Sequence, residues 1–147
     1  MVFRGLLISG CLLLASCGST SPDELNIRIV KLPNGEQVRC EVLAKEFEIR
    51  RGMIFRDSVP RGTGMLFIYP KPGKYSSWMY QVKVPLDIIW IDTAKRVVEI
   101  VANAPPCNTK ASECPTYGGH ADAQYMLELG GGEAQRCHLR EGDFLSF

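Results

Sequence analysis

The sequence has no excess of charge of either sign. Its 147 residues contain 17 Lys and Arg against 16 Asp and Glu, which gives a formal net charge of +1. The strong positive field that attracts nucleic acid or anionic lipid is therefore missing, and we expect no nucleic-acid partner. No run of like charges is long enough to act as an interaction tail. Hydrophobic residues make up 46% of the chain, which favours a single folded domain over disorder or a coiled coil.

The sequence also lacks the signatures of common catalytic and metal-binding classes. It contains two histidines, and neither belongs to an H-E-x-x-H pattern. No G-x-S-x-G nucleophile elbow is present. Four methionines, Met53, Met65, Met79 and Met126, are scattered along the sequence. Such spacing is more typical of residues that fill the core than of a Cu(I) site. We therefore expect no metal, no cofactor and no catalytic nucleophile.

No apolar run long enough for a membrane-spanning helix is found near the start of the chain. The run from Leu6 to Ala15 follows a single basic residue, Arg4, and is shorter than the roughly 20 residues that cross a bilayer. A basic start, an apolar middle and small residues at the end are typical of a secretory signal. The run ends in Leu-Ala-Ser-Cys, which resembles a bacterial lipobox with Cys17 as the lipidated residue. An ordinary signal peptide cut near Ala15 or Ser16 is the alternative.

The lipobox predicts how the chain is divided and where the protein is located. Residues 1–16 would be a lipoprotein signal peptide, residues 17–24 a lipidated tether and residues 25–147 a single domain. Acyl chains on Cys17 would hold the protein to a membrane, since each buried methylene contributes about 0.8 kcal/mol. Gly18 follows the cysteine, which resembles an outer-membrane address in double-membraned bacteria. We expect a lipid-anchored cell-envelope protein at the outer membrane, facing the periplasm.

Four cysteines remain after the lipidated one, and an exported chain with an even number of thiols is typical of a disulfide-bonded protein. Cys107 and Cys114 bracket a polar loop flanked by prolines. A bridge between them is predicted to stabilise the fold by about 2–3 kcal/mol. The remaining pair would be Cys40 with Cys137. A zinc site is the alternative, but the sequence has no C-x-x-C pair.

Short stretches of apolar residues, several of them alternating with polar ones, recur along the chain. They predict strands over residues 26–32, 37–43, 65–69, 75–82, 86–92, 96–101, 124–129 and 144–147. An Asn-Gly pair at residues 34–35 predicts a hairpin between the first two strands, and residues 93–95 connect a second hairpin. Residues 44–53 suit a short amphipathic helix and residues 133–137 a single helical turn. The prediction is an α+β domain rich in β-structure, mainly antiparallel, forming a small or partly open barrel with one or two short helices.

Stretches of sequence from residue 51 onward keep the order and spacing of those in a known family. They are Arg51-Gly-Met-Ile-Phe-Arg56, Gly64-Met-Leu-Phe67, Trp78-Met79, Val84-Pro-Leu-Asp-Ile88, Val97-Val-Glu-Ile100, Pro106-Cys107, Cys114-Pro-Thr-Tyr117, Tyr125-Met-Leu-Glu-Leu129 and Gly142-Asp143. Over roughly residues 38–147 the chain resembles domain of unknown function family 192, a group of small prokaryotic proteins. The chain departs from the family pattern at residues 53–54 and at residues 80–82, where a Lys-Asn-Thr triplet is common. The resemblance implies a compact β-rich domain, often exported, and no known reaction.

Aromatic residues form one part of the candidate ligand site. Trp78 and Tyr80 are two residues apart on an expected strand, so they share a face while Met79 takes the other. Such a pair could stack against a sugar ring or hold a cation. The alternative, which we favour for Trp78 on its own, is a place in the core.

Charged residues form the other part of the candidate ligand site, and these are Arg56 and Asp87. Asp87 shares its expected strand face with Ile89 and Ile91, where a carboxylate is costly unless it is hydrogen-bonded. A structural interpretation, in which Asp87 accepts backbone or Arg hydrogen bonds and holds a turn, is favoured over an acid–base role in a pocket.

The leading hypothesis is a non-catalytic, lipid-anchored module that binds a small ligand, a carbohydrate or a peptide through Arg56, Trp78, Tyr80 and Asp87. One alternative is a scaffold or partner-docking protein of the envelope that has no pocket. The other is a hydrolase or lyase that uses Asp87 as general acid or base. That third hypothesis requires Asp87 to lie in a cleft with a second polar group within reach.

Overall fold

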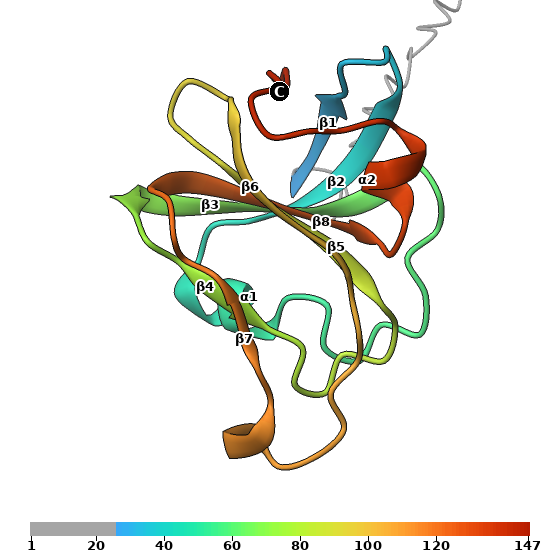
Figure 1. Ribbon diagram of the computed structural model, residues 1–147, viewed down its shortest axis with the longest axis vertical. Helices are drawn as coiled ribbons and strands as arrows, with labels where there is room; N and C mark the ends of the chain where they lie inside the picture. Colours follow the sequence, from blue (N-terminus) through green and yellow to red (C-terminus); the bar gives the residue numbers. More distant parts are fainter. Residues whose placement is uncertain (1–25) are drawn as a thin grey trace, which may run out of the picture.

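The computed structural model describes residues 26–147; the predicted signal peptide, the lipidation site at Cys17 and the tether lie outside the described residues. These residues form two sheets, one of six strands in the order β1-β2-β3-β8-β5-β6 and one of two strands, β4-β7 (Figure 1). The elements are β1 (Ile27–Lys31), β2 (Gln37–Leu43), α1 (Glu46–Arg51), β3 (Thr63–Gly73), β4 (Ser76–Trp78), β5 (Leu86–Ile91), β6 (Val97–Ala104), the 3-10 helix η2 (Ala111–Glu113), β7 (Thr116–Gly118), β8 (Ala123–Gly130) and α2 (Glu133–Arg136). Within this part of the chain, no helix has the length and apolar character needed to cross a membrane.

The larger sheet is mainly antiparallel, and only β2 and β3 run parallel. Both predicted hairpins are confirmed, with Val30 opposite Val38 in β1–β2 and Ile89 opposite Ile100 in β5–β6. The sheet does not close, since β1 and β6 form its two edges. The predicted α+β class rich in β-structure is therefore confirmed, with an open mixed sheet and two short helices at α1 and α2.

The C-terminal segment joins the two edges of the open sheet. The Lys31 amide donates to the Ser146 carbonyl at 2.8 Å on the β1 side, and the Leu145 amide donates to the Lys95 carbonyl at 2.9 Å next to β6. The segment crosses from one edge to the other instead of pairing along either. Phe144 and Ser146 therefore form isolated bridges, and the predicted strand over residues 144–147 is wrong. These bonds cover backbone groups that an open edge would leave exposed.

The central strands divide their side chains between two apolar clusters, one on each face of the sheet. Leu66, Ile89 and Leu127 belong to one cluster, and Phe67 and Met126 belong to the other. This division follows from the two-residue period of a strand. Because β5 is buried over its whole length, each of its large side chains contributes roughly 1.5–3 kcal/mol of burial.

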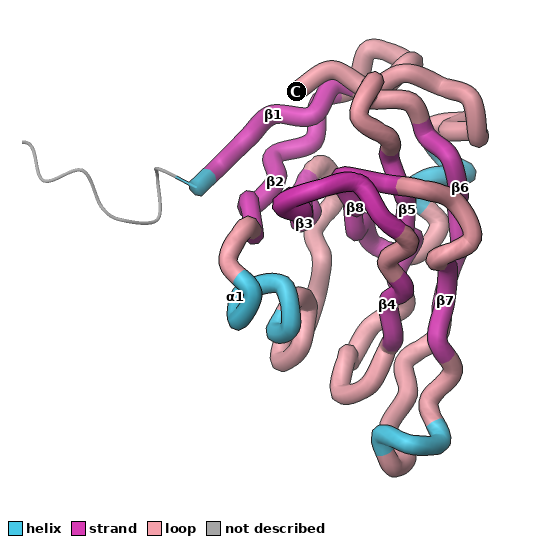
Figure 2. The backbone as a smooth tube through the Cα atoms, turned by 90° about the vertical axis from the view of Figure 1, so that its left-hand side faces the viewer, coloured by secondary structure: helices cyan, strands magenta, loops and turns pink. Residues whose placement is uncertain are grey.

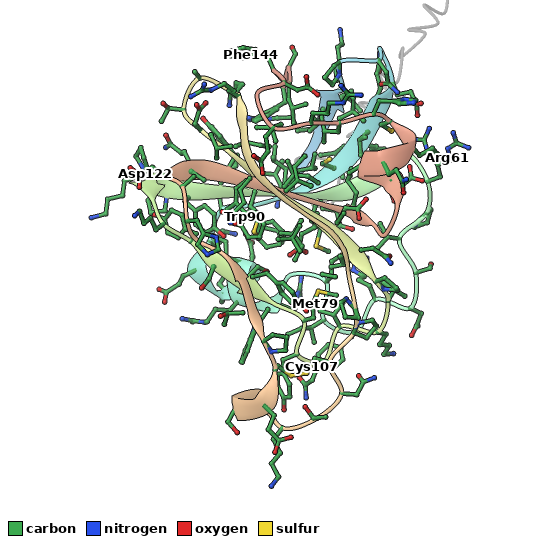
Figure 3. The ribbon with its side chains drawn as sticks, viewed as in Figure 1. Arg61, Met79, Trp90, Cys107, Asp122 and Phe144 are labelled. Carbon is green, nitrogen blue, oxygen red and sulfur yellow. A yellow bond between two sulfur atoms is a disulfide. The ribbon has the colours of Figure 1, made fainter. Side chains whose placement is uncertain are left out.

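Trp90 of β5 connects the small sheet to the large one. Its indole N–H donates to the carbonyl of Tyr75, just before β4, at 2.6 Å. Gly118, at the end of β7, has φ +69°, and a Cβ there would lie 2.2 Å from Trp90 Cζ2. Trp90 lies near the centre of the molecule (Figure 3), and β4 and β7 run side by side away from the large sheet (Figure 2). The position of β4 therefore depends on contacts with Trp90.

The predicted strand over residues 75–82 is too long. Only Ser76–Trp78 forms β4, and Tyr80 makes an isolated bridge to Cys107. The chain turns here because Gln81 has φ +60° and the Val82 amide bonds back to the Met79 carbonyl at 3.2 Å. The helices at α1 and α2 fall within the predicted ranges.

The four cysteines among residues 26–147 form one disulfide and two free thiols. The predicted bond between Cys107 and Cys114 is present, with an S–S distance of 2.10 Å, at the base of the loop that projects from the sheet (Figure 3). Cys40 and Cys137 are both buried and are not joined, so the predicted second disulfide is not found. That pairing came from elimination, which does not test whether two Cα atoms lie within about 7 Å with their Cβ atoms facing each other.

Candidate functional site

A pocket of about 330 Å³ has lining residues from α1, β3, β4 and β8. Of these elements, α1 and β4 lie on the same side of the large sheet (Figure 2). The volume of the pocket is at the lower end of the range for small-molecule sites, roughly 300–1,000 Å³. We call it the Glu128 pocket. It is lined by Ile49, Arg50, Arg51, Gly52, Met53, Ile54, Phe67, Tyr69, Ser76, Ser77, Trp78, Tyr80, Val82, Met126 and Glu128.

Glu128 lies in the wall of this pocket, on β8. The strand places its side chain on the same face as Met126, among apolar residues. Its exposed fraction is 5%. One hydrogen bond reaches the carboxylate, from the Ser77 hydroxyl to Oε1, and it is long at 3.5 Å. The other oxygen, Oε2, is buried and has no hydrogen-bond donor in the described part of the chain.

Burial dominates the electrostatics of Glu128. Burial raises the pKa of the carboxyl to about 7, and the hydrogen bond from Ser77 lowers this pKa by a smaller amount. Burial also raises the pKa of the nearby Tyr69 phenol above its ordinary value, and the negative charge of Glu128 and the presence of Tyr75 add to that rise. Near neutral pH, Glu128 is therefore poised between a carboxylate that accepts hydrogen bonds and a carboxylic acid that can donate one.

Aromatic rings make up another part of the wall. Trp78 is 43% exposed while Met79 is fully buried, so the predicted division of faces is confirmed. The rings of Trp78 and Tyr80 have centroids 5.2 Å apart. The expectation that Trp78 belongs to the core is wrong, because β4 is part of a short two-stranded sheet at the surface, where its side chain reaches solvent. Deeper in the site, Tyr69 stacks on Tyr75 with centroids 3.6 Å apart.

Arg56 lies outside the Glu128 pocket. It lines a second pocket of about 240 Å³ together with Arg39 and Thr63. Its guanidinium donates to Glu41 Oε2 at 2.6 Å. Met53 lines both pockets and lies between them. The sequence grouped Arg56 with Trp78 and Tyr80, but the structure places it in a separate depression where a carboxylate already pairs with it.

Asp87 is fully buried on the opposite face of the sheet. Its Oδ1 accepts the backbone N–H groups of Asn103 at 2.6 Å and Gly132 at 3.1 Å, and its Oδ2 accepts that of Ala134 at 2.6 Å. The carboxylate thus holds the turn that begins α2, as the favoured structural interpretation predicts. An exposed ligand contact or an acid–base role is incompatible with this position, which removes the basis of the hydrolase or lyase hypothesis.

Sequence reasoning did not select Glu128, although a signal was present. Glu128 is the one charged residue in the stretch Tyr125–Leu129, which was predicted to be a strand. A carboxylate on an apolar strand needs a hydrogen-bond partner, and this holds for Glu128 as it does for Asp87. The structure separates the two residues, because Asp87 has its partners and Glu128 Oε2 has none.

Within residues 26–147 the structure shows no cluster of three or more His, Cys, Asp or Glu side chains placed to hold a metal ion. The Glu128 pocket contains a single carboxylate and no histidine or cysteine among its lining residues. Its chemistry is that of one partly protonated acid surrounded by aromatic rings.

Comparison with known proteins assigns the family. The model of DUF192, described as "Uncharacterized ACR", matches residues 29–147. The chain belongs to the DUF192 family. No curated protein matches the sequence with statistical significance.

Two solved structures show the same fold as this DUF192 protein. A protein of unknown function from Novosphingobium aromaticivorans has a TM-score of 0.75 and 28% identity, over 82% of this chain and 85% of that one. A proposed transcription regulator from Sinorhizobium meliloti has a TM-score of 0.72 and 22% identity, over 80% of this chain and 89% of that one. At that identity the second likeness establishes the fold alone.

Proposed function

We propose that this DUF192 protein is a non-catalytic binding module of the cell envelope, and that its ligand occupies the Glu128 pocket. The observation that carries the proposal is that Glu128 lines the pocket while its buried Oε2 has no donor within the described structure. An unpaired polar atom in an apolar site is unfavourable. A ligand that supplies the missing donor therefore gains binding energy from it.

The composition of the pocket favours binding over hydrolysis. Hydrolysis of a glycosidic bond commonly needs two carboxylates on opposite sides of the bond. Only one carboxylate lines the pocket, and the residues that accompany it include no histidine. A scaffold without a pocket is disfavoured for a different reason, since a hollow with a polar group and several aromatic rings is typical of small-molecule sites.

The wall of the pocket indicates the shape of the ligand. The exposed ring of Trp78 and the neighbouring ring of Tyr80 offer a surface for a flat apolar face. Glu128 offers an acceptor deeper in the site. A sugar ring, a short peptide or another small molecule that combines an apolar face with a hydrogen-bond donor fits this arrangement.

A thermal-shift screen of sugars, dipeptides and small amines tests the proposal. A ligand at one hundred times its Kd stabilises the folded state by about 2.7 kcal/mol, which raises the Tm by several degrees. We expect Trp78→Ala to abolish the shift. Phe144→Ala is the matched control, because Phe144 is an exposed aromatic residue (62%) at the other end of the molecule (Figure 3). Equal shifts in wild type and Trp78→Ala would place the ligand elsewhere.

The location in the envelope is the second part of the proposal. Support comes from the lipobox-like sequence ending at Cys17 and from the disulfide between Cys107 and Cys114, because disulfides persist in oxidising compartments. The protein should fractionate with membranes and accumulate as an unprocessed precursor under globomycin. Cys17→Ser should show the same processing defect. Unchanged processing and fractionation of that variant would argue against a lipid anchor.

A further inference from the structure

The charge of Glu128 has no counterpart in the described structure. None of the salt bridges there includes Glu128. Among residues 26–147 its only donor is the neutral hydroxyl of Ser77, at 3.5 Å. A buried carboxylate is strongly unfavourable unless a cation and hydrogen bonds compensate it. The site is therefore incomplete in a specific way: Arg50 and Arg51 also line the pocket, but among residues 26–147 no positively charged group pairs with the Glu128 carboxylate.

The surrounding rings reinforce the same preference. Phe67, Tyr69, Trp78 and Tyr80 all line the pocket. The face of an aromatic ring carries negative electrostatic potential and attracts cations. A neutral hydroxyl could donate to Oε2, but it would leave the negative charge uncompensated and would gain nothing from the ring potential. A cation is attracted both by the charge of the Glu128 carboxylate and by the potential of the rings.

We propose, building on the proposed function, that the Glu128 pocket selects ligands that carry a protonated amine. The ammonium N–H groups bind Oε2 of Glu128, and the adjoining carbon atoms pack against the rings of Trp78 and Tyr80. A primary or secondary ammonium is preferred to a quaternary one, because a quaternary nitrogen has no hydrogen to donate.

The charges at the rim of the pocket define what else the ligand carries. Arg50 and Arg51 of α1 also line the pocket. Arg50 is paired with Glu46, whereas Arg51 has no salt bridge among residues 26–147. A small amine is repelled weakly by these guanidinium groups. An amine that also bears an anionic group is favoured, since Arg51 can meet that group at the rim.

The pH dependence of amine binding follows from the groups that face Glu128. Arg50 and Arg51 on α1 remain charged, Ser77 on β4 does not ionise, and Tyr69 on β3 stays neutral because its pKa is raised. Glu128 therefore changes charge between pH 5 and pH 8. With a pKa of about 7, its ionised fraction grows by more than tenfold over that range. Affinity for an amine should increase by a similar factor, whereas affinity for a neutral molecule should not.

Binding of two isosteric probes distinguishes the possibilities. Cyclohexylammonium and cyclohexanol have similar shape, and their Kd values can be measured at pH 5 and pH 8 by NMR chemical-shift titration of the whole protein. We expect cyclohexylammonium to bind at least tenfold more tightly than cyclohexanol at pH 8, and to lose at least tenfold in affinity at pH 5. Glu128→Gln should remove both the preference and the pH dependence. The wild-type measurements do not depend on the folding of any variant.

Each outcome decides one of the two proposals. If cyclohexanol binds at pH 8 as tightly as cyclohexylammonium or more tightly, and changes the NMR chemical shifts of Trp78, selection of amines is refuted. The proposal that the pocket binds a ligand would still stand. Amine binding that is the same at pH 5 and pH 8 would also overturn selection of amines, since the charge of Glu128 would then play no part. If neither probe nor any sugar or dipeptide perturbs Trp78 at millimolar concentration, the binding pocket itself is refuted.

Discussion

Replacing Glu128 with Gln should stabilise the protein in alkaline solution and leave it unchanged in acid. The folded state raises the pKa of Glu128 from 4.5 to about 7, so it holds this proton more tightly than the unfolded chain does. The stabilisation is fully present below about pH 4.5 and is lost as the pH rises through about 7. At 1.36 kcal/mol for each pKa unit, the loss reaches about 3 kcal/mol.

Gln keeps the shape of the side chain and stays neutral at every pH. We therefore expect Glu128→Gln to exceed wild type by about 3 kcal/mol in free energy of unfolding at pH 8, and to equal it near pH 4.5. Urea unfolding at both pH values measures the difference. Glu113→Gln is the control, because Glu113 is exposed in the disulfide loop. A difference between Glu128→Gln and wild type that is the same at both pH values would refute the reasoning.

Three further changes test the structural account. Asp87→Ala leaves three backbone N–H groups without their acceptor, one of them buried and two partly buried, and should cost about 3–5 kcal/mol in urea unfolding; a loss below about 1 kcal/mol would exclude the capping role. Replacing Cys107 and Cys114 by Ser should cost about 2.5 kcal/mol relative to oxidised wild type, measured the same way, and reduced wild type should then match the variant. Gly118→Ala places a Cβ against Trp90 and should cost about 2–4 kcal/mol, with a changed near-UV circular dichroism spectrum; a wild-type spectrum would show that β7 does not depend on this contact.

Local patterns predicted the fold where neighbours in sequence are neighbours in space. The alternating residues of 37–43 match β2 from end to end, because one face of that strand is buried. The hairpin turns and the disulfide between Cys107 and Cys114 are equally local. The parallel pairing of β2 with β3 and the crossing of residues 144–147 between two edges depend on contacts far apart in sequence. Periodicity carries no information about those contacts.

In the candidate site, too, the sequence predicted local relations between residues and not the contacts between distant ones. Trp78 and Tyr80 were brought together correctly, because a spacing of two residues places them on one face. Arg56 and Asp87 were grouped with them on charge alone, and charge does not reveal whether a partner is already present. Both had one, Glu41 for Arg56 and three backbone amides for Asp87. Glu128 was marked in the sequence as a lone charge on an apolar strand, but only the packing around it shows that one of its oxygens has no donor in the described structure.

The central claim is that Glu128 is an unpaired, buried carboxyl group in a ligand pocket. Carbon-13 NMR of the Glu128 side-chain carboxyl, titrated from pH 4 to pH 9, tests it most directly. The account predicts a midpoint near pH 7 in the free protein and a midpoint at least one unit lower in saturating cyclohexylammonium, because the bound cation stabilises the ionised form. A midpoint near 4.5 in the free protein, or one that saturating amine leaves unchanged, would contradict it.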